Sequence, residues 1–141
     1  MELPEPEQNK NKKYLRTAII IITIGIAVLK VLNGDDKKTK YLKHLTKSYS
    51  SELPKTLDGN TRWDSVSYDE DSNLVCYHTL LNFEADVIDR TIFIDEIGEK
   101  VDEEYESSSD FEDIRDLGIS IIYNYSGKNG KFIASIKVPR E

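Results

Sequence analysis

Cys76 and His78 come nearer than other residues of this chain to the spacing of a catalytic or metal-binding pair. They stand two positions apart in the apolar stretch 73–83, so in a β-strand both side chains project from the same face. A thiolate beside an imidazole makes a nucleophile or half of a zinc site. The chain has one cysteine, and His44 is its other histidine, so zinc would need carboxylates as further ligands. We therefore predict a buried or edge Cys and His, with no catalytic, cofactor or metal site, and keep a small enzyme using this pair as the third alternative.

The segment before this stretch matches the first part of a calcium-binding loop. Asp69, Asp71 and Asn73 occupy the first three ligand positions of an EF-hand loop. The sixth position is Leu74, where the loop needs glycine, and the twelfth is Leu80, where a bidentate glutamate should stand. The pattern therefore predicts an acidic hairpin turn and not a calcium site.

A dense group of carboxylates offers the clearest binding surface. Residues 86–106 are predicted to form a helix, because Phe93, Ile97, Val101 and Tyr105 recur every four residues. The opposite face is acidic, and such a face would attract a basic protein partner and raise its association rate. The alternative is a solvated face that keeps the domain soluble. The predicted acidic face consists of Asp95, Glu99, Asp102, Glu103, Glu106 and Asp113.

The charge of the chain is unevenly distributed over its 141 residues, a length that suffices for one domain with a short appendage. The net charge is −7, and residues 57–141 hold 20 acids against eight bases. Nucleic-acid binding needs clustered lysine and arginine, so this acidic body excludes it.

An apolar run near the N-terminus raises the question of a membrane. Residues 17–29 carry no charge, and as a helix they would rise about 20 Å against roughly 30 Å of hydrocarbon. The span becomes nearly complete if Arg16 and Lys30 reach toward the two interfaces. We predict a transmembrane signal anchor over residues 17–32, in a bacterial inner membrane, with the C-terminal domain periplasmic. The alternatives are a cleaved secretory signal, which would leave a secreted or periplasmic protein, and a buried core helix.

The remaining chain is predicted to be α+β. A basic helix begins at Lys37 and buries one apolar stripe; its lysines either meet lipid headgroups or, as we favour, are solvated. Two strands follow over residues 61–68 and 73–83, then the helix 86–106, and then a short helix opened by the capping box at 109–112. The apolar stripe of the first helix consists of Tyr41, Leu42, Leu45 and Tyr49.

Asn129-Gly130 predicts a C-terminal hairpin with a type I′ turn. Closing the hairpin there gives one apolar face and one mixed face. The complete fold prediction is an N-terminal transmembrane helix followed by a small antiparallel sheet, in the order α-β-β-α-α-β-β, packed on helices. The apolar face is predicted to pair Tyr125 with Ala134, Tyr123 with Ile136 and Ile121 with Val138, and the mixed face pairs Ser126 with Ile133.

The order of apolar and turn residues along the chain resembles that of a known class of proteins. Leu53-Pro54, Ser65-Val66, Arg115-Asp116-Leu117-Gly118 and the hairpin at Gly130 form a spaced pattern of apolar and turn residues. This pattern resembles small membrane-anchored or exported bacterial envelope domains of unknown function and, more distantly, the pilotins of type II secretion systems. The resemblance implies a periplasmic interaction domain without an active site. The chain departs from pilotins in having no lipidation cysteine.

These observations give one leading function and one alternative. We predict a non-enzymatic, membrane-anchored envelope protein whose periplasmic domain binds another protein of a secretion or envelope-assembly type. The alternative is an immunity or inhibitor protein that masks a basic toxin or effector. The predicted domains are a disordered polar tail (1–16), the signal anchor (17–32), a basic juxtamembrane helix with linker (33–56) and the acidic α+β domain (57–141).

Overall fold

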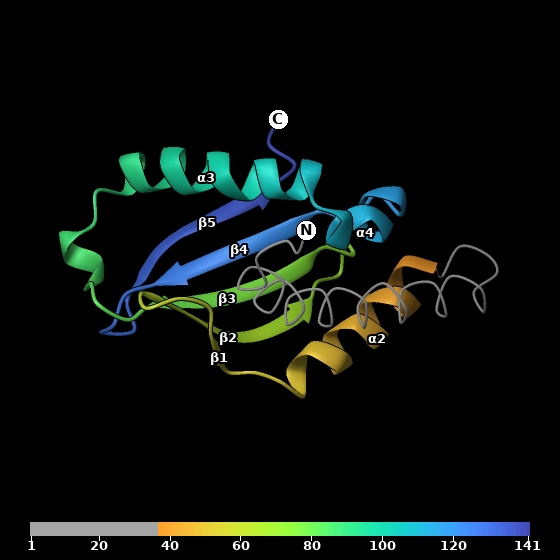
Figure 1. Cartoon of the computed structure of the whole chain (residues 1–141), viewed down its shortest axis with the longest axis horizontal. Helices are drawn as coiled ribbons and strands as arrows, with labels where there is room; N and C mark the ends of the chain where they lie inside the picture. Colours follow the sequence, from red (N-terminus) through yellow and green to blue (C-terminus); the bar gives the residue numbers. More distant parts are fainter. Residues whose placement is uncertain (1–36) are drawn as a thin grey trace, which may run out of the picture.

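The computed structural model describes residues 37–141, which form one curved sheet with helices on one of its faces (Figure 1). The predicted polar tail and the predicted anchor over 17–32 lie outside the described residues. The helices are α2 (Lys37–Ser50), α3 (Arg90–Ser107) and α4 (Glu112–Asp116), with the 3-10 turns η1 (Ala85–Val87) and η2 (Ser109–Phe111). The strands are β1 (Lys55–Thr56), β2 (Thr61–Tyr68), β3 (Leu74–Leu80), β4 (Ile121–Ser126) and β5 (Phe132–Val138).

The five strands lie in sequence order, but the sheet is mixed. β1 with β2, β2 with β3 and β4 with β5 pair antiparallel, whereas β3 and β4 run parallel with Leu74 beside Ile121. The predicted antiparallel sheet is therefore wrong, and the predicted element order lacks the short edge strand β1. The parallel pairing arises because α3 carries the chain back along the sheet, so that β4 starts at the same end as β3 (Figure 1).

The transmembrane helix that opens the fold prediction, over residues 17–32, lies outside the described residues. Within residues 37–141, none of the helices combines the length and apolar character that a membrane span requires. The N-terminal element of the described fold is instead α2, whose Tyr41, Leu42 and Leu45 are buried in the core of the domain. Its apolar stripe thus packs against the sheet and leaves the lysines exposed.

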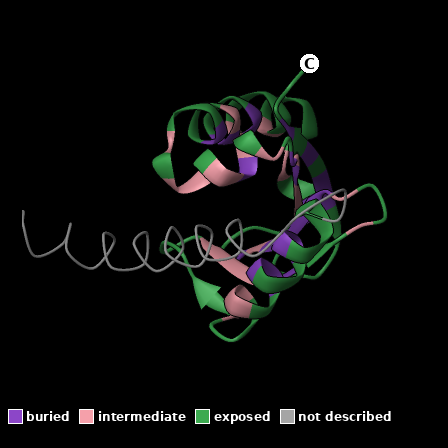
Figure 2. Ribbon diagram, turned by 90° about the vertical axis from the view of Figure 1, so that its right-hand side faces the viewer, coloured by how far each residue is buried: buried purple, intermediate pink, exposed green. Residues whose placement is uncertain are grey.

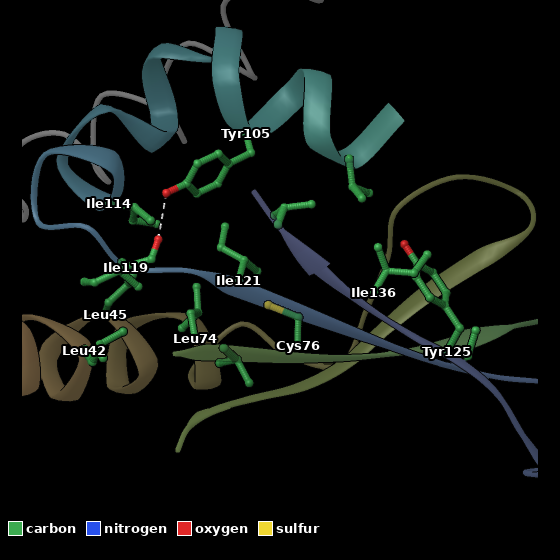
Figure 3. Close-up of a cluster of buried hydrophobic side chains, with 14 of the residues drawn as sticks. Leu42, Leu45, Leu74, Cys76, Tyr105, Ile114, Ile119, Ile121, Tyr125 and Ile136 are labelled. Atoms are coloured by element: carbon green, nitrogen blue, oxygen red, sulfur yellow. Dashed lines mark hydrogen bonds between the residues drawn. The ribbon is translucent and has the colours of Figure 1, made fainter. Parts of the chain in front are cut away.

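The core lies between the sheet and the helices. Figure 2 shows the buried residues gathered on the inner sides of the sheet and helices, with exposed residues on the outer sides. Ile114, Ile119 and Ile121 are almost fully buried where α4 leads into β4, and the Tyr105 hydroxyl donates a 2.8 Å hydrogen bond to the Ile119 carbonyl (Figure 3). This bond anchors the end of α3 to the start of β4.

The C-terminal hairpin has the predicted register along its apolar face, with Tyr125 opposite Ala134 and Ile121 opposite Val138. Its turn differs from the prediction. The Gly130 amide donates to the Gly127 carbonyl, and Gly130 alone of the four turn residues has a positive φ, of 78°. A type I′ turn needs two such residues, so the loop is a type I turn followed by a glycine bulge. The bulge places Phe132, and not Ile133, opposite Ser126.

Candidate binding site

A groove runs over the helix-covered face of the sheet between α2 and α3. It encloses a cavity of about 230 Å³. Its floor comes from the three central strands, one end from α2 and the linker after it, and the far wall from the end of α3 and η2. The aromatic, acidic, imidazole and thiol side chains in its lining include Tyr49, Trp63, Cys76, His78, Glu104, Asp110, Phe111 and Tyr123.

Aromatic rings cross this face of the sheet in a continuous row. The rings of Tyr49 and Trp63 have centroids 4.9 Å apart, and Trp63 stacks on His78 with a centroid distance of 6.1 Å. His78 in turn stacks on Tyr125 at 5.2 Å, and Phe93 of α3 meets Tyr125 edge-on at 5.1 Å. The row therefore joins α2 to α3 through β2, β3 and β4.

His78 is the polar residue at the centre of the row. It is 6 % exposed, and its Nδ1 atom has no hydrogen-bond partner among the described residues. Burial lowers the pKa of His78 to about 4, and the nearby Asp64 carboxylate only partly opposes this shift. The imidazole is therefore neutral at physiological pH, and one of its nitrogens can accept a hydrogen bond.

Two carboxylates stand on the far wall of the groove. Asp110 belongs to η2, and Glu104 lies in the last turn of α3. Burial raises the pKa of Glu104, and the charge of Asp110 raises it further. Arg115 fixes this wall by donating to the carbonyls of Tyr105 and Ser108, so the two carboxylates are held in place by α4.

Cys76 lines the same groove, but its thiol is unreactive. Its side chain projects from β3 on the side of Leu74 and Ile121 (Figure 3) and is buried. Burial raises the pKa of the Cys76 thiol to about 12, so the nucleophilic thiolate is scarce at neutral pH. Within residues 37–141, no group of three or more His, Cys, Asp or Glu side chains is placed to hold a metal ion.

The predicted calcium-like segment forms the turn between β2 and β3. The Asp69 carboxylate accepts hydrogen bonds from the backbone amides of Asp71 and Asn73, at 3.1 Å and 2.9 Å, and from the Asn73 side chain. The carboxylate thus closes the turn by local bonds of the kind that aspartate commonly makes.

The predicted acidic face is divided between two helices. Asp95, Glu99, Asp102, Glu103 and Glu106 lie on α3, whereas Asp113 lies on α4. Arg140, after the last strand, lies over this part of α3: its backbone amide donates to Asp102 at 2.7 Å, and its guanidinium lies 3.9 Å from Asp95. The chain itself therefore neutralises part of the acidic charge.

Sequence reasoning missed the aromatic and acidic walls of the groove. The helical pattern places Tyr49 in a core-facing stripe, and nothing in the sequence distinguishes Glu104 from the other acids of α3. One signal was available: His78 is the polar member of a strand face that is otherwise apolar, with Leu74, Cys76 and Leu80. A buried histidine in an otherwise apolar strand face indicates a candidate site for polar interactions.

The fold and the groove define a small α+β domain with a five-stranded mixed sheet whose helix-covered face carries an aromatic groove. Residues 36–134 match the family model described as "Domain of unknown function (DUF8479)". The chain belongs to this family. No curated protein matches the sequence.

A solved structure shares the architecture. It is the crystal structure of a protein of Pseudomonas aeruginosa described as a "putative secreted protein", and it is 14 % identical in sequence, with a TM-score of 0.61. The match covers 73 % of this chain and 89 % of that one. This similarity shows the fold, and it agrees with the resemblance to bacterial envelope domains of unknown function; the more distant likeness to pilotins stays a prediction.

Proposed function

We propose that this chain is an exported, non-enzymatic domain that binds a segment of another protein in the groove between α2 and α3. The observation that carries the proposal is the pair Tyr49 and Trp63 at one end of the aromatic row, whose rings line a cavity instead of filling it. Aromatic residues around a partly buried pocket are typical of sites where a partner inserts an anchoring side chain.

The size of the cavity favours a side chain over a cofactor. Pockets for drug-sized ligands have volumes of about 300–1,000 Å³, and the groove holds about 230 Å³. The described part of the chain also supplies no activated nucleophile beside the groove, because the Cys76 thiol stays protonated. A binding role needs neither a large cavity nor a reactive group.

Export to the periplasm or the exterior is supported by two observations. The structurally similar Pseudomonas protein carries the description "putative secreted protein". The uncharged run 17–29 has the length of the apolar part of a cleaved secretory signal. Secretion or envelope-assembly proteins are the partners expected in that compartment.

Site-specific photo-crosslinking in cells that produce the chain tests the proposal. A photoreactive amino acid is placed at Leu57, which lines the groove and is 49 % exposed, and in a control at Tyr77, which is 43 % exposed on the opposite side of β3. We expect one protein to crosslink at position 57 and not at position 77. Equal yields at the two positions, or no crosslink at position 57, would contradict the proposal.

The acidic face of α3 favours a second candidate, an inhibitor that masks a basic effector. Glu99, Asp102, Glu103 and Glu106 line a shallow depression with Arg140 at its edge. A photoreactive residue at Glu103 separates the candidates, because an inhibitor of this kind would crosslink there and not at Leu57. For this candidate, the protein captured by the crosslink at Glu103 would be a basic effector.

A further inference from the structure

The charges around the groove indicate what kind of side chain fits it. Among the described lining residues, three are carboxylates (Glu52, Glu104 and Asp110) and one is basic (Lys55). An anionic ligand would meet repulsion from the far wall, and an apolar ligand would bury those carboxylates without compensation. A cation is the ligand class that relieves both problems.

The aromatic walls point to the same class. Tyr49, Trp63, Phe111 and Tyr123 come from four different elements and surround the cavity. The Trp63 indole N–H already donates to the Ser65 carbonyl at 3.1 Å, so the face of the ring, and not its polar edge, is available to a ligand. Ring faces attract cations, and the effect is larger where water is excluded.

His78 separates a guanidinium from a simple ammonium ion. Its buried Nδ1 lacks a partner within residues 37–141, and a buried acceptor or donor without a hydrogen bond is unfavourable. A guanidinium has five N–H donors in a planar fork, so it can stack on an aromatic ring, donate to a carboxylate and donate to an imidazole nitrogen at once. A lysine ammonium lacks the planar shape that stacks.

Building on the proposed function, we infer that the groove is an arginine-binding site. The anchoring side chain of the partner segment is an arginine that lies against the rings of Trp63 and Tyr49, is paired with Glu104 and Asp110, and is bonded to His78. The side chain enters from the open mouth of the groove between α2 and α3. Glu104 and His78 contribute specificity, and the rings contribute the contact area.

The test uses the full-length chain and the fluorescence of Trp63, its one tryptophan. The probes are blocked tripeptides with a central arginine, citrulline, lysine or leucine between glycines; citrulline keeps the shape of arginine and loses its charge. We expect saturable quenching by the arginine peptide, with affinity about tenfold above that of the citrulline peptide, and weaker binding at high salt. Equal affinity for citrulline or leucine would mean an apolar pocket, and equal affinity for lysine would mean no guanidinium site; either result overturns the inference.

Matched variants locate the site. Glu104→Gln should weaken arginine binding about tenfold, whereas Glu106→Gln, on the same helix but outside the groove lining, should leave it unchanged. His78→Phe keeps an aromatic ring at this position but removes the imidazole nitrogen that accepts a hydrogen bond. It should therefore reduce the ratio of arginine affinity to lysine affinity. Circular dichroism and thermal unfolding confirm that each variant is folded before it is scored.

Two further outcomes would overturn the inference: the first leaves the proposed function intact, and the second also contradicts it. If no tripeptide binds while the crosslink at Leu57 persists, the groove binds its partner through another side chain. If Trp63 emission and sedimentation both change with protein concentration, a second copy of the chain occupies the groove. If the arginine peptide binds but no crosslink forms at Leu57, the proposed function is contradicted and the groove is a cation site alone.

Discussion

The imidazole of His78 lies nearly parallel to the indole of Trp63, with the ring planes inclined by 13° and the centroids 6.1 Å apart. The two residues are directly opposite each other in the antiparallel pair of β3 and β2. This pairing places a neutral, buried imidazole against the chain's one tryptophan, so that an optical signal reports on the polar centre of the groove.

The burial of His78 should make stability depend on pH. The pKa of this residue is about 4 in the folded chain and 6.5 ordinarily. Between these values the unfolded chain binds a proton that the folded chain does not, so the free energy of unfolding should fall as the pH decreases, by up to about 3 kcal/mol. Urea unfolding at several pH values between 7 and 4 measures it.

The matched control for that experiment is His78→Gln. Other groups also titrate in this range, and Glu104, with its raised pKa, contributes in the opposite sense. The difference between the wild-type and variant curves isolates the imidazole. Parallel curves from pH 7 to pH 4 would show that His78 is accessible to protons in the folded state.

Cys76 should be inert toward thiol reagents in the folded chain. Its pKa of about 12 and its burial together should slow labelling at pH 8 roughly a thousandfold relative to the chain in concentrated urea. A colorimetric thiol assay with and without urea gives the ratio. Rapid labelling of the folded chain would revive the alternative of an enzyme using Cys76 and His78.

Removing the Tyr105 hydroxyl should loosen the wall that carries Glu104. Tyr105→Phe leaves the Ile119 carbonyl without the 2.8 Å bond in a buried site, and should cost about 1–2 kcal/mol of unfolding free energy. Tyr77→Phe is the control, because Tyr77 is 43 % exposed and should change stability very little. Similar losses in the two variants would contradict a specific role for this bond.

Gly127 should tolerate no side chain. A Cβ there would lie 2.4 Å from the Ala85 backbone nitrogen and 2.9 Å from the Glu84 carbonyl carbon. Because backbone atoms cannot move aside like a flexible side chain, Gly127→Ala should cost roughly 2 kcal/mol or more. Gly59→Ala, where a Cβ meets nothing within 4 Å, is the control. Thermal melting that does not distinguish the two variants would argue against the close approach.

The hairpins were predictable because local rules determine them. The alternation of apolar residues around Gly130 predicts the pairs Tyr125–Ala134 and Ile121–Val138 correctly. The turn type and the partner of Ser126 were wrong, since Asn129 does not take the positive φ that a type I′ turn requires. The alternating pattern of β3 likewise identified its two faces.

The direction of the β3–β4 pairing and the groove depend on contacts far apart in the sequence. A helix between two strands is typical of a parallel crossover, and that signal over residues 86–106 was available but outweighed by the hairpins on either side. The groove combines Tyr49, Trp63 and Glu104, which share no local pattern. Such a juxtaposition becomes visible only when the fold is known.

The parallel pairing of β3 with β4 also governs the order in which the domain can assemble. The β2–β3 hairpin is complete once residue 80 has emerged from a ribosome or an export channel, yet its β4 partner begins at Ile121. During that delay β3 presents an apolar edge with unpaired backbone groups, which is a template for aggregation. A nascent chain of this family would therefore need a chaperone, or rapid formation of α3, until its last two strands arrive.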